Sequence, residues 1–434
     1  MGAEQDLFVL LERIFREEAG RLTASLVRLL GDFDMAEEVV SEAVVEALEH
    51  WPRDGVPERA SSWLLTTARR KALDRFRREA VYRKKVALLA PLADRLPQEP
   101  DDRLRLIFTC CHPVLGREAQ VALTLRAVAG LTTAEIARAF VVPEVTLAKR
   151  IVRAKQKIVA SHVPYRIPAP DELAARLDEV LTVIYLVFNE GYLTTAGSAP
   201  LRRDLARDAE WLASLLVQLL PEEPEPLGLL ALTRLHLARW PTRLAPDGRL
   251  VLLERQDRSL WDRRSIAASI TLIERAAALQ RPGRYQIEAM IAALHCEAPR
   301  WEETDWPQIA VLYALLVEID PSPVVALSRA IVRRYTDGPA ASLAEVDTLS
   351  ELLQGYHLFH ATRATLLRDL GAYPEAARAD AVALALTKNS GERVLLEERL
   401  GGVPRGVSQS SEKEKAHSTG AGQRILVAQE DQRR

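Results

Sequence analysis

Carboxylate side chains are concentrated near the start of this chain: seven acids and no base lie between Asp32 and Glu49. A helix beginning at Asp34, with acids at its positive end, would bury one apolar face and turn the other acids away from it. The expected buried face comprises Val40, Ala43, Val44, Ala47, Leu48 and Trp51. The outer carboxylates, with Glu38 and Glu42 among them, suit a basic protein surface; a solvated helix face is the alternative.

Two later stretches carry the opposite charge and suit the phosphate backbone of DNA. The first, from Arg69 to Lys85, has nine bases and two acids. We expect a helix that starts near Trp63 with a cap at Ser61 or Ser62. Its buried face would comprise Leu65, Ala68, Ala72 and Phe76. Its outer face would carry Arg70, Lys71, Arg75, Arg77 and Arg78.

The loop before this helix, from Pro52 to Pro57, is a candidate for holding a base taken out of the DNA stack. Trp63 has two interpretations, because it can stack on a base or pack in the core as tryptophan usually does. We therefore assign base capture to the loop rather than to Trp63.

The second basic stretch, Thr146 to Lys157, has five bases and no acid and completes a predicted helix-turn-helix. The first helix would begin at a Thr132 or Thr133 cap, and Val141 to Glu144 would form the turn. In the second helix the expected inner stripe is Leu147, Ile151, Ala154 and Ile158. The outer face then presents Thr146, Lys149, Arg153 and Lys157, with Arg150 at its edge. Recognition helices need donors at these places, although any basic helix after a turn shares the pattern.

Motifs for catalysis are missing from the sequence, which has no glycine-rich phosphate loop, no His-Glu-x-x-His and no Gly-x-Ser-x-Gly. Cys110, Cys111 and His112 could begin a zinc or redox site, but adjacent cysteines are poorly spaced to chelate one ion, so core packing is favoured. We expect no enzyme activity, no cofactor and no metal. Three cysteines fit a reducing cytoplasm. The longest apolar run, Val180 to Phe188, is shorter than the ~20 residues that cross a bilayer, so we expect a cytoplasmic protein without membrane contact.

The 434 residues exceed one core, and apolar residues recur at helical spacing nearly everywhere, which predicts several domains and an all-α fold. Only Pro246 to Leu253 suggests a turn with an extended piece. Bases slightly exceed acids up to Tyr165, by 26 to 23, and acids exceed bases afterwards, by 37 to 32. The predicted domains are 1–80, a linker at 81–100, 101–163, 164–299, 300–400, and a disordered tail at 401–434.

A faint repeat lies between Trp306 and Leu400. Two segments, Arg334 to Ala341 and Asp369 to Ala377, each join helical stretches, and equivalent alanines in them are 36 residues apart. This spacing is near the ~34-residue period of tetratricopeptide units. Two ordinary helical hairpins are the alternative.

These pieces, in this order, resemble bacterial extracytoplasmic-function sigma factors of the sigma-70 family. The stretch from Phe8 to Arg78 is similar to region 2 and that from Ala119 to Ile158 to region 4. The remainder resembles the subgroup with a long helical C-terminal extension ending in tetratricopeptide-like helices. That likeness is carried by Phe108 to Pro113, Phe188 to Tyr192, and Leu252 to Arg258. Val145 and Lys149 depart from the small Gly and the Ser that are common in the family, so the promoter sequence does not transfer.

The resemblance implies a transcription initiation factor that binds core RNA polymerase and promoter DNA. Core polymerase would contact Asp34, Glu38 and Glu42. The promoter minus-10 element would contact Gly55, Arg59, Ser61, Ser62, Arg70, Lys71, Arg75 and Arg78. The minus-35 element would contact Thr146, Lys149, Arg150, Arg153 and Lys157. The extension would control initiation and present its repeats to a protein partner.

A helix-turn-helix regulator that acts without polymerase is the alternative function. It leaves the acidic helix unexplained and predicts a symmetric dimer site on DNA.

Overall fold

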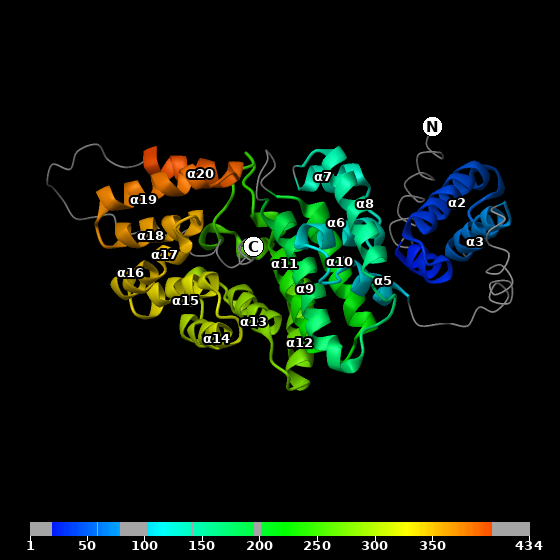
Figure 1. Ribbon diagram of the computed structural model, residues 1–434. Coiled ribbons are helices and arrows are strands. Elements are labelled where there is room, and N and C mark those ends of the chain that lie inside the picture. The colour runs from blue at the N-terminus through cyan, green and yellow to red at the C-terminus, as the bar shows by residue number, and fades with distance from the viewer. Residues whose placement is uncertain (1–19, 59, 79–101, 141, 195–200, 402–434) are drawn as a thin grey trace. The chain divides into compact units, whose positions relative to one another are not determined.

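The computed structural model describes residues 20–58, 60–78, 102–140, 142–194 and 201–401 (Figure 1). The predicted all-α fold is confirmed, because these residues form helices and no β-strand. One isolated antiparallel bridge, between Leu244 and Leu250, encloses a turn at Gly248 (φ 82°). This turn lies where the sequence predicted a turn and an extended piece. The linker expected at 81–100 and nearly all of the tail expected at 401–434 lie outside the described residues.

The chain divides into two compact units, Met1–Ile184 and Tyr185–Arg434. The N-terminal unit contains a helix at residues 20–30 and seven labelled helices, the last of which continues past the division. These are α2 (Phe33–Asp54), α3 (Ala60–Arg78), α5 (Arg103–Cys110), α6 (Arg117–Ala127), α7 (Thr133–Ala139), α8 (Glu144–Ala160) and α9 (Pro170–Tyr192).

Helix α2 begins one residue earlier than the sequence predicted. Its cap is Asp32, whose side chain accepts hydrogen bonds from the amides of Asp34 (2.8 Å) and Met35 (3.0 Å). Five of the six residues predicted for the inner face are buried or half-buried, whereas Leu48 is exposed. Asp32 could not be distinguished from Asp34 by pattern, since both precede the apolar period.

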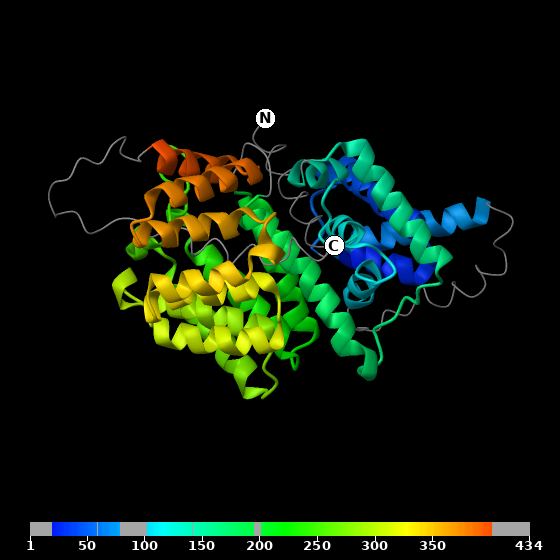
Figure 2. The same ribbon diagram turned by 60° about the vertical axis from the view of Figure 1, so that its left-hand side comes forward.

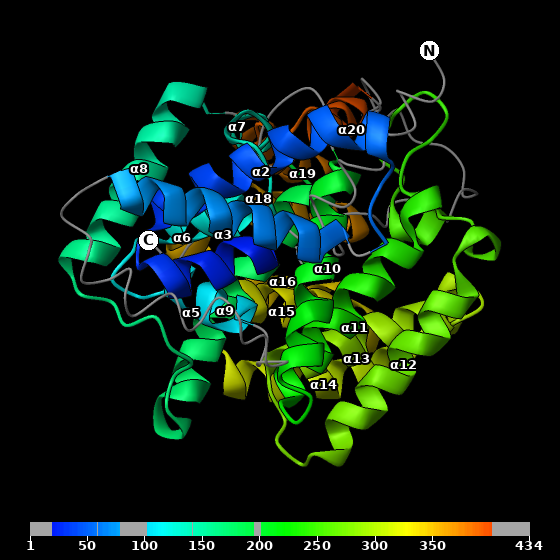
Figure 3. The ribbon, with the colours of Figure 1, turned by 90° about the vertical axis from the view of Figure 1, so that its right-hand side faces the viewer.

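Helices α2 and α3 lie side by side as an antiparallel pair (Figure 3). Helix α3 starts at Ala60, so the serines predicted as its cap lie in its first turn instead. Ala68 and Ala72 are buried, as expected, whereas Leu65 is only half-buried, its neighbour Leu64 is buried, and the side chain of Phe76 lies outside the described residues. Trp63 is half-buried and packs edge-to-face on the buried Trp51, with ring centroids 5.4 Å apart. The tryptophan therefore contributes to the packing of this pair.

The helix-turn-helix consists of α7 and α8. Thr132 caps α7 in a reciprocal capping box with Glu135, which confirms one of the two predicted caps. The four residues predicted for the inner stripe of α8 are all buried: Leu147, Ile151, Ala154 and Ile158.

The C-terminal unit continues with helices packed largely in chain order (Figure 2). Its α-helices are the end of α9, α10 (Arg203–Leu219), α11 (Pro224–Ala238), α12 (Arg263–Ala278), α13 (Arg284–Glu297), α14 (Trp306–Ile319), α15 (Pro323–Thr336), α16 (Pro339–Thr348), α17 (Ser350–Leu353), α18 (His357–Asp369), α19 (Tyr373–Leu386) and α20 (Ser390–Gly401). Short 3-10 turns lie at Trp240–Thr242, Leu253–Arg255, Arg258–Leu260 and Trp301–Glu303.

Both segments of the predicted repeat are helix-to-helix turns in the structure. Gly338 (φ 89°) joins α15 to α16, and Gly371 (φ 78°) joins α18 to α19. Left-handed backbone of this kind favours glycine, so the two turns end their helices by the same means. The tetratricopeptide assignment itself stays a prediction.

Across the described residues, no helix combines the length and the apolar character needed to cross a membrane.

Candidate nucleic-acid and protein interfaces

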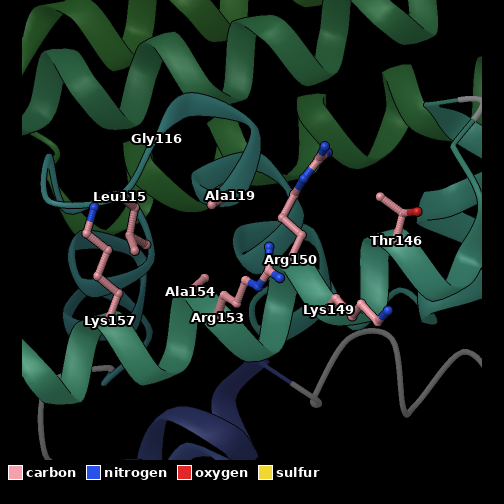
Figure 4. A pocket seen from close by; sticks show the side chains of 9 residues that line it. All are labelled: Leu115, Gly116, Ala119, Thr146, Lys149, Arg150, Arg153, Ala154 and Lys157. Atoms are coloured by element: carbon pink, nitrogen blue, oxygen red, sulfur yellow. The ribbon is translucent and has the colours of Figure 1, made fainter.

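A pocket of about 320 Å³ follows one side of α8, and every residue predicted to read the minus-35 element lines it (Figure 4). These side chains are Thr146, Lys149, Arg150, Arg153 and Lys157. The opposite wall is apolar or small and comes from the turn before α6 and its first residues, with Leu115, Gly116 and Ala119. The pocket thus places four cations in one concave, solvent-exposed surface.

The cations of this pocket differ in their partners. Arg150 forms an ion pair with Glu118 of α6, with 2.5 Å between Nη2 and Oε2. Within the described part of the chain, Lys149, Arg153 and Lys157 form no ion pair, and all three are exposed. Three cations of the predicted recognition face are therefore available to an anionic ligand, and the fourth is oriented by a carboxylate.

The acidic face of α2 is paired with the basic face of α3. Arg75 donates to both Glu38 and Glu42, and its Nη2 lies 2.5 Å from Glu42 Oε1. Glu46 binds Arg70 as well as Lys71, whose Nζ lies 2.8 Å from its Oε2. The surfaces that the sequence assigned to two different ligands consequently neutralise each other in this structure.

The pKa values of these acids follow from their pairing. The hydrogen bond from Arg75 lowers the pKa of Glu38, and the bond from Lys71 lowers that of Glu46. Both carboxylates therefore stay ionised at neutral pH and keep their capacity to bind cations.

Asp34 binds a residue on the buried side of α8. Lys155 of α8 is buried and places its Nζ 2.8 Å from Asp34 and 3.2 Å from Glu37. Arg126 of α6 approaches Glu37 at 3.6 Å. Asp34 is thus one of the contacts that join α2 to the helix-turn-helix within the N-terminal unit.

Further contacts join the helix at residues 20–30 to the segment between residues 102 and 165, which contains the helix-turn-helix. The Tyr165 hydroxyl donates to the carbonyl of Ala24 at 2.9 Å, and Arg28 binds Asp102 at 3.0 Å. Gly20 packs so closely on Val128 that a Cβ atom would lie 2.3 Å from its carbonyl oxygen.

The residues predicted for the minus-10 element are only partly described. Gly55 follows α2 with φ 81° and is exposed, as is Ser62. Arg59, and the side chains of Ser61 and Arg78, lie outside the described residues. Gly55 and Ser62 therefore lie in and just after an exposed connection between α2 and α3.

Cys110 and Cys111 lie in the core, as the packing interpretation predicted. Burial raises the pKa of both thiols, and that of Cys111 reaches about 12. The Sγ atom of Cys111 lies 3.4 Å from the Thr124 hydroxyl. Thiols in this state are poor nucleophiles at neutral pH.

The motif residues after α8 form buried networks in the C-terminal unit. Arg239 donates to the Tyr192 hydroxyl at 2.7 Å and contacts His236 at 2.6 Å. Arg258 donates to two carbonyls at the end of α13, those of His295 (2.7 Å) and Ala298 (2.6 Å). Tyr192 and Arg258, the two motif residues in these networks, thus join segments that are distant in the sequence.

The sequence did not indicate three residues that bind the predicted site residues or their neighbours: Lys155, Arg126 and Glu118. Lys155 lies in the basic stretch but, at 100° per residue, about 140° from Arg150 and about 160° from Arg153, on the opposite side of α8, which was a usable signal. Glu118 and Arg126 gave none, because their partners are distant in the sequence.

Comparisons with known proteins match three parts of the chain. Residues 14–81 match the family model for sigma-70 region 2, and residues 105–158 match that for sigma-70, region 4. Residues 176–277 match a family of unknown function, DUF6596. An uncharacterized protein of Rhizobium meliloti (strain 1021) is 42% identical over 391 residues, which cover 87% of this chain and 92% of that protein. No solved structure matches the chain.

Proposed function

The chain belongs to the sigma-70 family, as an extracytoplasmic-function-type sigma factor with a C-terminal extension, and from this premise we propose how its surfaces direct initiation. Members of the family bind core RNA polymerase and promoter DNA. The observation that carries the proposal is the pocket along α8, where the side chains expected to contact DNA line one surface.

Recognition of the minus-35 element is assigned to α8. Thr146 and Lys149 lie in its first two turns, the part of a recognition helix that enters the major groove. Arg153 and Lys157 follow one and two turns later, where phosphates lie beside the groove. Arg150 is fixed by Glu118, which suits a positioning contact.

Melting of the minus-10 element is assigned to α3 and the connection before it. Gly55 and Ser62 are exposed there, and Arg70 remains exposed although it binds Glu46. We infer that three bases of α3 bind DNA by releasing their carboxylate partners on α2 and binding phosphates instead: Arg70, Lys71 and Arg75.

Docking on core polymerase is assigned to Glu38, Glu42 and Asp34. Each already has a basic partner in the free chain, Arg75 for the first two and Lys155 for the third. Basic residues of polymerase would then replace an internal partner. The net binding free energy is therefore the difference between the free energies of the new and the internal ion pairs.

A pull-down with core polymerase followed by run-off transcription tests this function. The full chain should bind core and support transcription from a limited set of promoters. Sequence-specific binding to DNA without core, as a symmetric dimer, would instead favour the regulator that acts without polymerase.

Control of initiation is assigned to the C-terminal extension. Its helical array carries an exposed apolar series, Val311, Leu315 and Ile319, at successive turns of α14. Such a series is a feature of protein-binding helices, which supports a protein partner on this array. Fusion to the sigma regions keeps the extension at high effective concentration, so weak contacts would be populated.

A further inference from the structure

Val145 is an apolar side chain in an unexpected place. It lies in the first turn of α8 and is 66% exposed, between the exposed residues Glu144 and Thr146. A β-branched residue at an exposed helix position does not stabilise the helix, because its side chain loses rotamer freedom there. Helix formation and core packing therefore do not explain Val145.

The position of Val145 on the helix relates it to the basic face. At 100° per residue, Val145 and Lys149 are about 40° apart and separated by one turn, so their side chains are neighbours. Thr146 lies on the other side of Lys149 and lines the pocket with it. The leading end of α8 thus presents an ammonium group with methyl groups beside it.

The major groove contains one apolar feature that these methyl groups match, the C5-methyl group of thymine. Lysine in turn donates to the O6 and N7 acceptors of guanine. We propose that Val145 is a specificity-determining residue that contacts a thymine methyl group in the minus-35 element, beside the base pair that Lys149 contacts. This inference rests on the proposed function, because it assumes that the leading end of α8 enters the groove.

Two further valines supply matched controls. Val152 and Val159 follow Val145 at intervals of seven residues on the same side of α8 and are 49% and 64% exposed. They lie about 10 and 21 Å further along the axis, beyond the turns that enter a groove. If the three valines formed a protein-binding stripe instead, all three would matter alike.

The experiment uses holoenzyme reconstituted from the full chain and core polymerase. A promoter library with a randomised minus-35 region is selected with this holoenzyme, and each thymine of the selected element is replaced by deoxyuridine. The replacement removes the C5-methyl group and preserves base pairing. Affinities are measured for the native chain, Val145→Ala, Val152→Ala and Val159→Ala, with circular dichroism to verify folding.

We expect one thymine whose replacement weakens the native holoenzyme about fourfold, the effect of losing one buried methyl group. Val145→Ala should bind the thymine and deoxyuridine promoters equally, and the other two variants should behave like the native chain. An undiminished deoxyuridine effect in Val145→Ala, or none at any thymine in the native chain, overturns the inference.

Equal losses in all three valine variants also overturn the inference and favour a protein-binding stripe. In each of these cases the holoenzyme still selects promoters, so the proposed function stands. A chain that forms no promoter-selective holoenzyme overturns both.

Discussion

Arg75 contacts two carboxylates, Glu38 and Glu42, that lie 37 and 33 residues earlier in the chain. Taken alone, the acids indicate a protein surface and the arginine a DNA surface. Their contact means that either ligand must compete with an internal partner. Binding of polymerase or DNA to these charged side chains therefore requires that each first release its internal ion-pair partner.

Removing Lys149 or Arg153 tests the recognition face at the scale of one side chain. Each alanine variant should lower promoter-dependent transcription and leave core binding unchanged, because both side chains are exposed on the pocket side of α8. Loss of a base contact should cost about 1 to 3 kcal/mol and relax preference at one minus-35 position, whereas loss of a phosphate contact should weaken all promoters alike. Unchanged run-off yield on a linear template would contradict the assignment.

Reversing the charge of Glu38 and Glu42 together tests docking on polymerase. The double variant Glu38→Arg, Glu42→Arg should bind core at least tenfold more weakly, because a hydrogen bond to a charged group contributes about 1.5 to 3 kcal/mol. The measurement is a quantitative pull-down, with circular dichroism on the free protein.

Arg75 supplies the control for that variant. Adding Arg75→Glu restores the internal ion pairs with reversed polarity, so folding should be preserved while core binding stays weak. Arg75→Ala alone frees both carboxylates and should not reduce core affinity. If the triple variant regained full core binding, the loss in the double variant would be a folding defect, and the docking assignment would be wrong.

At the scale of elements, α8 was predicted well because its pattern is local. The inward stripe repeats at helical spacing, so Leu147, Ile151, Ala154 and Ile158 follow from the sequence alone. The pairing of α3 with the acids of α2 was not predicted, because it depends on how two helices cross. For the same reason Lys155 was grouped with the DNA-facing bases by composition, although it is buried against α2.

Helix α11 provides a test of a contact that sequence periodicity does not indicate. A Cβ atom at Gly228 would lie 2.5 Å from the backbone nitrogen of Gln286 and 2.8 Å from the carbonyl carbon of Tyr285, both on α13. Gly228→Ala should therefore force α11 and α13 apart and lower the free energy of unfolding by about 1 to 3 kcal/mol. A fall in the urea midpoint at constant slope would show this effect.

Gly355→Ala is the matched control, because a Cβ atom there meets no atom within 4 Å and the backbone is not left-handed. Its unfolding midpoint should stay close to that of the native chain. Because Ala favours a helix more than Gly does, loss of stability at Gly228 would not come from helix propensity; equal destabilisation by both alanines would contradict close packing as its cause.

At the scale of the whole molecule, the extension cannot be removed at the predicted domain boundary without damage. Tyr165, Arg176 and Glu179 lie beyond that boundary but belong to the N-terminal unit and bind its earlier residues: Arg176 donates to the Phe108 carbonyl at 2.5 Å, and Glu179 binds Arg117 at 2.7 Å. A chain ending at Ser161 would lose these contacts. A chain ending at Thr194 keeps them. Tyr185 and Phe188, which are buried in the C-terminal unit and would be exposed by the deletion, are replaced by Ser in this chain.

The chain ending at Thr194 tests control by the extension. We expect it to bind core polymerase like the full chain but to differ from it at least several-fold in run-off yield, because it lacks the part of the chain proposed to control initiation. The native full chain is the reference, and circular dichroism verifies that the shortened chain is folded, because the same two substitutions in the full chain would open cavities in the core of the C-terminal unit. Equal core affinity and equal yield would contradict intrinsic control and leave the extension to an external partner.

The pairing of α2 with α3 also bears on how the protein is made. The two helices are consecutive, so their contact can form early in synthesis, before the helix-turn-helix has left the ribosome. An unpaired basic helix emerging beside ribosomal RNA would meet a dense polyanion. Because the carboxylates of α2 precede Arg70, Lys71 and Arg75 in the chain, each of these bases emerges after its partner is already present. In this order of acid before base, the carboxylates of α2 can shield the cations of α3 from RNA during synthesis, until promoter phosphates replace them.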